Sequence, residues 1–133
     1  MNHHKKELNE SLLKIMLDKK LARFGDSLLN FLYSLALTKR RGEPAGEKVS
    51  DEILAAAARN IGIRNILPSR MNRGEIANSI EALLGYAWLK NKVTIEELIV
   101  IEKEINEPVK AMEKLTKILL KKLIKQDECE KHL

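Results

Sequence analysis

The chain has 133 residues and a mass of 15.2 kDa, which is room for one domain and excludes a multidomain enzyme. Lys and Arg number 24 against 19 Asp and Glu, and the net charge of +5 suits a polyanionic partner without requiring one. Helix-favouring residues are abundant, whereas Val and Thr number only four and three. We therefore expect a single all-α domain over residues 1–133.

One cysteine, Cys129, leaves no possibility of an internal disulfide. The apolar runs are much too short to cross a bilayer, and the first residues lead into an amphipathic segment and not into a cleavable signal. From these features we expect a soluble, cytoplasmic protein with no membrane partner.

The first predicted helical region spans residues 7–37, where apolar side chains recur at steps of three to five residues. The pattern fits one long helix or two shorter ones, and Asp18 is a candidate N-cap for a second. Residues 38–48 contain two glycines, a proline and a basic cluster, and this composition predicts a loop. The cluster comprises Lys39, Arg40 and Arg41.

Ser50 is a candidate N-cap for a helix that ends at about Ile61, with Gly62 as its stop. A second loop over residues 64–74 contains Pro68. Helical periodicity resumes at residue 75 and ends near residue 92.

Two further helices are predicted near the C-terminal end, within an amphipathic region over 94–127. Thr94 and Glu97 match a capping box, which opens a short helix to about residue 105. Pro108 suits the first turn of a last helix. That helix places lysines outward: Lys110, Lys114, Lys117, Lys121 and Lys125. The expected architecture is a compact bundle of five to six helices.

Two glycines inside predicted helices are the strongest clue to a site. A helical glycine costs about 1 kcal/mol relative to alanine, so it usually marks the close approach of another backbone. Gly25 directly precedes Asp26, and Gly85 follows Glu81 by four residues, on the same helical face. Helices that cross at these glycines bring the two acids together. Such a pair fits a hydrated divalent cation, although buried ion pairs or N-cap contacts remain the alternative.

The residues around both acids resemble the endonuclease domain of the ribonuclease III family. Residues 21–28, LARFGDSL, are similar to its signature helix in the short form seen in Mini-III. Residues 77–89, ANSIEALLGYAWL, are similar to its second catalytic helix. The resemblance covers about residues 18–92, and the double-stranded RNA-binding domain of longer members has no equivalent here.

This resemblance implies a homodimeric, all-α endoribonuclease that cleaves double-stranded RNA by hydrolysing its phosphodiester bonds with Mg²⁺, or with Mn²⁺ in its place. Asp26 and Glu81 occupy the positions of family metal ligands, and both are candidate catalytic residues. Asn78 stands where the family has a further Asp, and its amide oxygen is a candidate acceptor at the site. No further cofactor is expected.

The chain also departs from the family pattern. Lys19 and Ala22 replace two acids of the signature helix, Asn78 replaces a third, and Arg23 replaces an aromatic residue near the dimer interface. With two carboxylates left, we expect weaker metal binding than at a four-acid site.

Charge is distributed unevenly along the chain. Residues 38–73 hold eight basic and four acidic groups, whereas residues 74–107 hold three basic and seven acidic groups. The candidate RNA-binding residues, whose alternative role is a solvated surface, are Lys39, Arg40, Arg41, Arg70 and Arg73. Contacts from such groups to phosphates give affinity without sequence preference. Aromatic residues make up only 4% of the chain, which argues against binding of single strands by stacking.

Three functions are therefore open. The first is the metal-dependent nuclease. The second is a catalytically degenerate duplex-binding or scaffolding protein, because Lys19, Ala22 and Asn78 replace acids. The third is a helix-turn-helix DNA binder, which ranks low because residues 50–66 offer acids and alanines and few donors for base edges.

Overall fold

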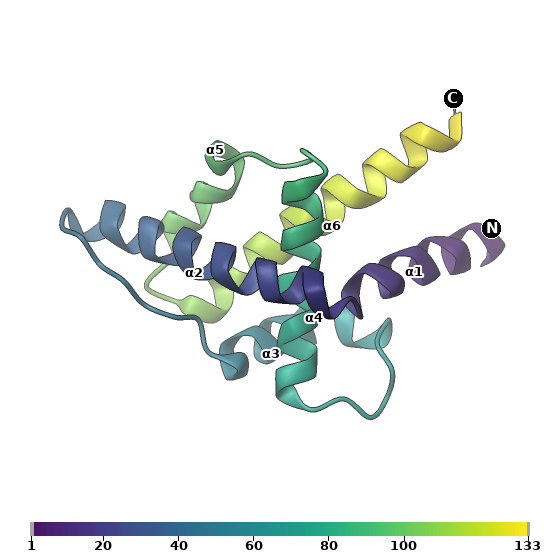
Figure 1. Ribbon diagram of the computed structural model, residues 1–133, viewed down its shortest axis with the longest axis horizontal. Coiled ribbons are helices and arrows are strands. Elements are labelled where there is room, and N and C mark those ends of the chain that lie inside the picture. Colours follow the sequence, from purple (N-terminus) through teal and green to yellow (C-terminus); the bar gives the residue numbers. More distant parts are fainter. Residues whose placement is uncertain (1, 133) are drawn as a thin grey trace.

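The computed structural model describes the backbone of residues 2–132 and the side chains of residues 7–124. This part of the chain is all-helical and contains no strand, as the sequence predicts (Figure 1). Its α-helices and short 3₁₀ helices are α1 (Asn2–Met16), α2 (Lys19–Arg41), α3 (Asp51–Asn60), η1 (Ile63–Asn65), α4 (Arg73–Leu89), α5 (Ile95–Leu98), η2 (Ile99–Glu104) and α6 (Pro108–His132).

Two helices occupy the first region, and Asp18 is the N-cap of the second, as predicted. Its carboxylate accepts hydrogen bonds from the backbone N–H groups of Lys20 at 2.9 Å and Leu21 at 3.0 Å. The end of α2 differs from the prediction, because the basic cluster of residues 39–41 is helical and not part of the loop. Gly42 stops the helix one turn later than expected through a left-handed φ of 75°. Basic side chains are favourable in this last turn because they face the negative end of the helix dipole.

The caps of α3 and α4 are formed by local side chains. The Ser50 hydroxyl accepts a hydrogen bond from the backbone N–H of Ile53 at 3.2 Å, which confirms the predicted cap. The helix α4 begins two residues earlier than predicted, because Asn72 and Glu75 form a reciprocal capping box. It ends at Leu89, three residues before the predicted end.

Thr94 and Glu97 form the predicted capping box. The helix that they open remains α-helical for only four residues and then tightens into the 3₁₀ helix η2 over residues 99–104. The last helix begins at Pro108, as expected.

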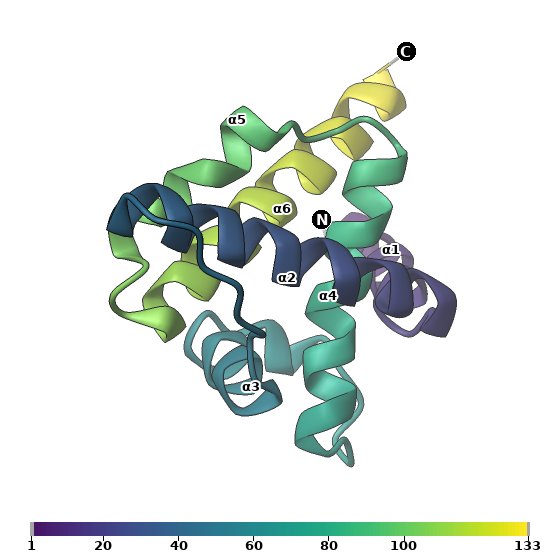
Figure 2. The same cartoon turned by 60° about the vertical axis from the view of Figure 1, so that its left-hand side comes forward.

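The helix α4 forms the centre of the structure. Its side chains Ile80, Leu83 and Leu84 are fully buried, and the helix packs against α1, α2, α3 and α6. Figures 1 and 2 show α2 running across α4, with α3 below the crossing. In the view of Figure 1, α6 passes behind α4, so α2 and α6 lie on opposite sides of it.

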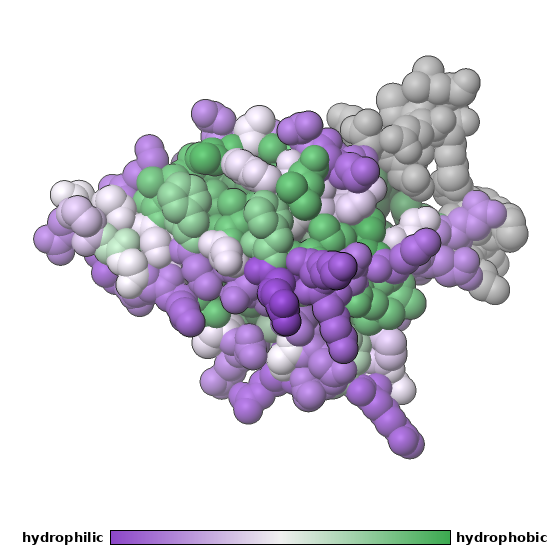
Figure 3. Space-filling view, viewed as in Figure 1, coloured by the Kyte–Doolittle hydropathy of each residue, from purple (hydrophilic) through white to green (hydrophobic). Residues whose placement is uncertain are grey.

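One face of α2 carries apolar side chains that remain open to solvent. Phe24 is 39% exposed and Phe31, two turns later, is 51% exposed. Figure 3 shows hydrophobic residues gathered between α2 and α5, and hydrophilic residues over the crossing and the lower part of this face. Within the described part of the chain, no helix combines the length and apolar character needed to span a membrane.

Candidate active site

The crossing of α2 and α4 is a contact between backbones. A Cβ atom added to Gly25 would lie 1.8 Å from the carbonyl oxygen of Glu81, and one added to Gly85 would lie 2.6 Å from the carbonyl oxygen of Leu21. No side chain fits at either position. The predicted crossing at the two glycines is therefore confirmed, and it fixes the backbone beside Asp26 and Glu81.

A polar hollow of about 410 Å³ opens beside this crossing. Three helices contribute to it, although their residues lie far apart in the sequence. Its lining consists of Lys19, Ala22, Arg23 and Asp26 from α2, Asp51 from α3, and Asn78 and Glu81 from α4.

Glu81 is the buried acid of this hollow, with 4% of its surface exposed. Burial, a hydrogen bond with Asp26 and the negative charges of Asp26 and Asp51 raise the pKa of Glu81 to about 9. The carboxyl group therefore keeps a proton at neutral pH when no cation is bound. Asp26 and Glu81, predicted from the sequence to converge, lie in direct contact.

Asn30 holds Asp26 and connects it to the segment that leads into α3. Its side-chain nitrogen donates to Asp26 Oδ1 at 3.2 Å, and its side-chain oxygen accepts from the backbone N–H of Val49 at 3.0 Å. Sequence reasoning did not single out Asn30. Its position one turn after Asp26 was the available signal.

Asp51 is a third carboxylate of the hollow that sequence reasoning missed. From the sequence, its position directly after the Ser50 N-cap indicates only that its charge favours the start of α3. Its position depends on the loop before α3, which returns along α2. Ser34 Oγ accepts from the Glu47 backbone N–H at 2.9 Å, and Thr38 Oγ1 accepts from that of Ala45, also at 2.9 Å.

Asn78 presents its amide nitrogen to Glu81. In the amide orientation that satisfies its surroundings, the nitrogen donates to Glu81 Oε1 and to the Gly74 carbonyl oxygen, both at 3.3 Å. An oxygen aimed at the site was expected from the sequence. The residue instead restrains the Glu81 carboxyl group.

The predicted RNA-contacting residues are all exposed and come from three segments of the chain: the end of α2, the loop before α4 and the start of α4. Arg73 lies beside the hollow, because it pairs with Glu52 in the first turn of α3 at 4.0 Å. Arg70 lies in the loop before α4. The basic cluster of residues 39–41 is about 20 Å along α2 from Asp26, and its Arg41 pairs with Glu47 at 3.1 Å.

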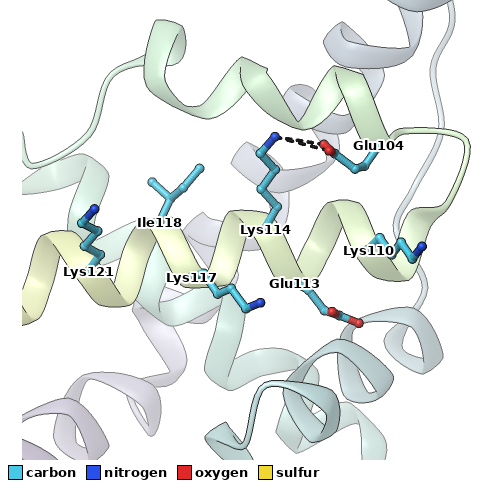
Figure 4. A pocket seen from close by; sticks show the side chains of 7 residues that line it. All are labelled: Glu104, Lys110, Glu113, Lys114, Lys117, Ile118 and Lys121. Carbon is cyan, nitrogen blue, oxygen red and sulfur yellow. Dashed lines mark hydrogen bonds and ion pairs between the residues drawn. The ribbon is translucent and has the colours of Figure 1, made fainter.

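A second hollow, of about 310 Å³, lies on α6 and contains most of the predicted outward lysines (Figure 4). Its lining consists of Glu104, Lys110, Glu113, Lys114, Lys117, Ile118 and Lys121. Lys114 pairs with Glu104 at 3.1 Å, and Lys110 pairs with Glu107 at 3.4 Å. The side chain of Lys125 lies outside the described residues.

Among the side chains of residues 7–124, no group of three or more His, Cys, Asp or Glu residues is arranged to hold a metal ion. The first hollow nevertheless fits a hydrated cation. Two carboxyl groups in contact need either a shared proton or a positive charge between them. Hard divalent cations accept a small number of carboxylates with water completing the coordination. Asp26 and Glu81 therefore form a chemically suitable donor pair.

Two comparisons with known proteins address the identity of the chain. A search of curated proteins found no match. The family model for ribonuclease III matches residues 19–128, which extends the resemblance beyond residue 92 into α6. Both glycine-bearing helices and the whole lining of the hollow lie within the matched region. The chain belongs to the ribonuclease III family.

Proposed function

We propose that this protein is a metal-dependent endoribonuclease that cleaves double-stranded RNA by hydrolysing phosphodiester bonds. Membership of the ribonuclease III family suggests this class of activity. The observation that carries the assignment to a site is the contact between Asp26 and Glu81 in the hollow at the α2–α4 crossing. These two residues are the proposed metal ligands, with Mg²⁺ as the cation and Mn²⁺ as a substitute.

The residues of the hollow have separate roles in this proposal. A bound divalent cation supplies positive charge that offsets the charge of the reacting phosphate and lowers the pKa of a water molecule. Asp26 and Glu81 would hold that cation, with Glu81 in its ionised form. Asn30 keeps Asp26 in position and Asn78 restrains Glu81, so the ligands are oriented before substrate arrives.

Duplex RNA is the substrate that suits this surface. An A-form helix is recognised mainly through its shape and backbone, which requires basic side chains and no aromatic platform. Arg73 pairs with Glu52, which is next to Asp51 of the hollow in the first turn of α3, and we assign it a phosphate contact there. We assign Arg70 a phosphate contact from the loop before α4. The cluster Lys39, Arg40 and Arg41 lies further along α2, where it contacts the backbone beyond the cleavage position.

We further propose that the protein acts as a homodimer, so that two sites address the two strands. The exposed side chains of Phe24 and Phe31 support this, because they leave an apolar face on α2 that a second copy would cover. The single endonuclease domain over residues 1–133 and the cytoplasmic location stay predictions.

A second candidate function keeps duplex binding without cleavage. Asn78 favours it, because the family pattern has an Asp at this position. The amide of Asn78 carries no negative charge, and its nitrogen is directed at Glu81. Lys19 and Ala22 also replace acids of the signature helix.

Cleavage of a long, end-labelled RNA duplex in Mg²⁺ tests the proposal. We expect wild-type protein to give products, and both Asp26→Asn and Glu81→Gln to abolish them while the helical circular dichroism signal persists. Glu113→Gln removes a carboxylate from the α6 hollow and is the matched control. We expect this variant to keep full activity. Retained cleavage in either site variant contradicts the assigned residues. Wild-type binding without product favours the second function.

A further inference from the structure

Two basic side chains line the acidic hollow without pairing to its acids. Lys19, Arg23 and Asp26 are spaced by four and three residues, so they follow one face of α2. Among the described residues, neither Lys19 nor Arg23 makes an ion pair. Some other basic residues of the chain do pair with an acid, as Arg41, Lys110 and Lys122 do.

Burial distinguishes one acid of the hollow from its other charged residues. Glu81 lies at its base and is 4% exposed, whereas Lys19 and Arg23 are exposed at its rim. Ala22, between them in the sequence, is 4% exposed and has too short a side chain to fill the space. Asp26 and Asp51 are exposed like the two basic residues, so the hollow has one buried acid at its base and both acids and bases at its rim.

The balance of formal charge indicates what the rim binds. Asp26, Asp51 and Glu81 carry three negative charges when ionised, and Lys19 and Arg23 carry two positive charges. One divalent cation at the base brings the hollow to a net charge of +1. A single phosphodiester group, with one negative charge, neutralises it.

We propose that Lys19 and Arg23 bind one backbone phosphate of duplex RNA at the rim of the hollow, next to the acids that hold the cation. This inference rests on the proposed function. Arg23 suits the role because its planar guanidinium group can donate two parallel hydrogen bonds to phosphate oxygens. Lys19, about 6 Å away along the helix axis, adds a point charge. A hollow with the larger set of acids in the family pattern would repel a phosphate group at this position. Lys19 and Arg23 instead attract the phosphate and position it.

The test measures binding of a fluorescent RNA duplex by anisotropy in Ca²⁺, which supplies the divalent charge in place of Mg²⁺, and a denaturing gel checks that the duplex stays intact. We expect Arg23→Gln to weaken binding about tenfold and Lys19→Gln about threefold. The logarithm of the association constant falls linearly with the logarithm of the salt concentration. Each change should reduce the magnitude of this slope by about one. Arg23→Lys restores part of the affinity, because it keeps the charge but loses the paired hydrogen bonds.

Two matched controls remove the same charge elsewhere. Lys20 is adjacent to Lys19 on α2 and does not line the hollow, and Lys117 is exposed on α6. We expect Lys20→Gln and Lys117→Gln to bind within twofold of wild type, and circular dichroism to show that all variants are folded. If the controls weaken binding as much as Lys19→Gln and Arg23→Gln, or if no variant weakens it, the rim is not a phosphate site and the proposed function stands. If wild-type protein does not bind the duplex, both proposals fail.

Discussion

The two hollows of this protein contain similar residues and arrange them in opposite ways. On α6, an acid of the hollow pairs with a base, in the contact between Lys114 and Glu104 at 3.1 Å. At the α2–α4 crossing, Asp26 and Glu81 contact each other instead of a base, and the pKa of Glu81 is raised to about 9. Compensated surface charge contributes little beyond solubility. A buried acid that lies against another acid must keep a proton or bind a cation, and acids perturbed in this way are typical of functional sites.

The largest effect should come from filling the crossing itself. Gly25→Ala introduces a methyl group 1.8 Å from the Glu81 carbonyl oxygen, which a helix backbone cannot accommodate without moving. We expect a loss of about 3 kcal/mol or more in the free energy of unfolding. Gly46→Ala is the control, because nothing lies within 4 Å of its added Cβ. Urea unfolding of the two variants measures the difference, and equal stability would show that the helices can separate at no cost.

The next effect concerns the proton on Glu81. The pKa is raised from 4.5 to about 9, so between these pH values the folded protein keeps a proton that the unfolded chain has lost. Stability therefore falls as pH rises through this window, by up to about 1.4 kcal/mol per pH unit. Glu81→Gln should remove this slope and exceed the stability of wild type at pH 8 in EDTA. Thermal unfolding against pH tests this, and parallel profiles for the two proteins would contradict it.

A smaller effect is expected at Asn30, which links Asp26 to the segment before α3. Asn30→Ala removes the hydrogen bonds to Asp26 at 3.2 Å and from Val49 at 3.0 Å. We expect a loss of about 1 to 2 kcal/mol in stability, together with weaker Mg²⁺ binding by titration calorimetry. Asn60→Ala, which removes the bond to Glu113 on α6, is the matched control. It should leave Mg²⁺ binding unchanged. If Asn30→Ala and Asn60→Ala lose the same metal affinity, Asn30 does not position Asp26.

The smallest effect belongs to the α6 hollow. The side chains of Lys114 and Glu104 are 35% and 34% exposed, and ion pairs with this exposure contribute about 0.5 kcal/mol. Lys114→Met should cost no more than this in urea unfolding, and the difference should shrink in 1 M salt. A loss comparable to that of Asn30→Ala would mean that the two hollows do not differ as described.

Features that depend on neighbouring residues could be predicted from the sequence. Asp18, Ser50 and Thr94 cap helices because their side chains reach N–H groups two or three residues ahead. The crossing at Gly25 and Gly85 could also be predicted, because a helix tolerates the cost of an internal glycine mainly where a second backbone must pass close to it.

Features that depend on long-range contacts could not be predicted. Asp51 enters the hollow only because hydrogen bonds between residues 13 and 19 positions apart guide the preceding loop along α2. The direction of the Asn78 amide depends on two partners within its own helix, Gly74 and Glu81, but residue types and spacing do not say which of its two atoms faces them. Lys19 and Arg23 were visible as departures from a family pattern, but their position at the rim required the hollow itself.

The most direct test of the proposed metal site is a crystal soaked in Mn²⁺ and measured at a wavelength where this ion scatters anomalously. We predict one anomalous peak in the hollow at the α2–α4 crossing, within coordination distance of both Asp26 and Glu81, and its loss in Glu81→Gln. A crystal with no peak there, or with Mn²⁺ bound only among the acids of η2 and α6, would contradict the assignment of Asp26 and Glu81 as metal ligands.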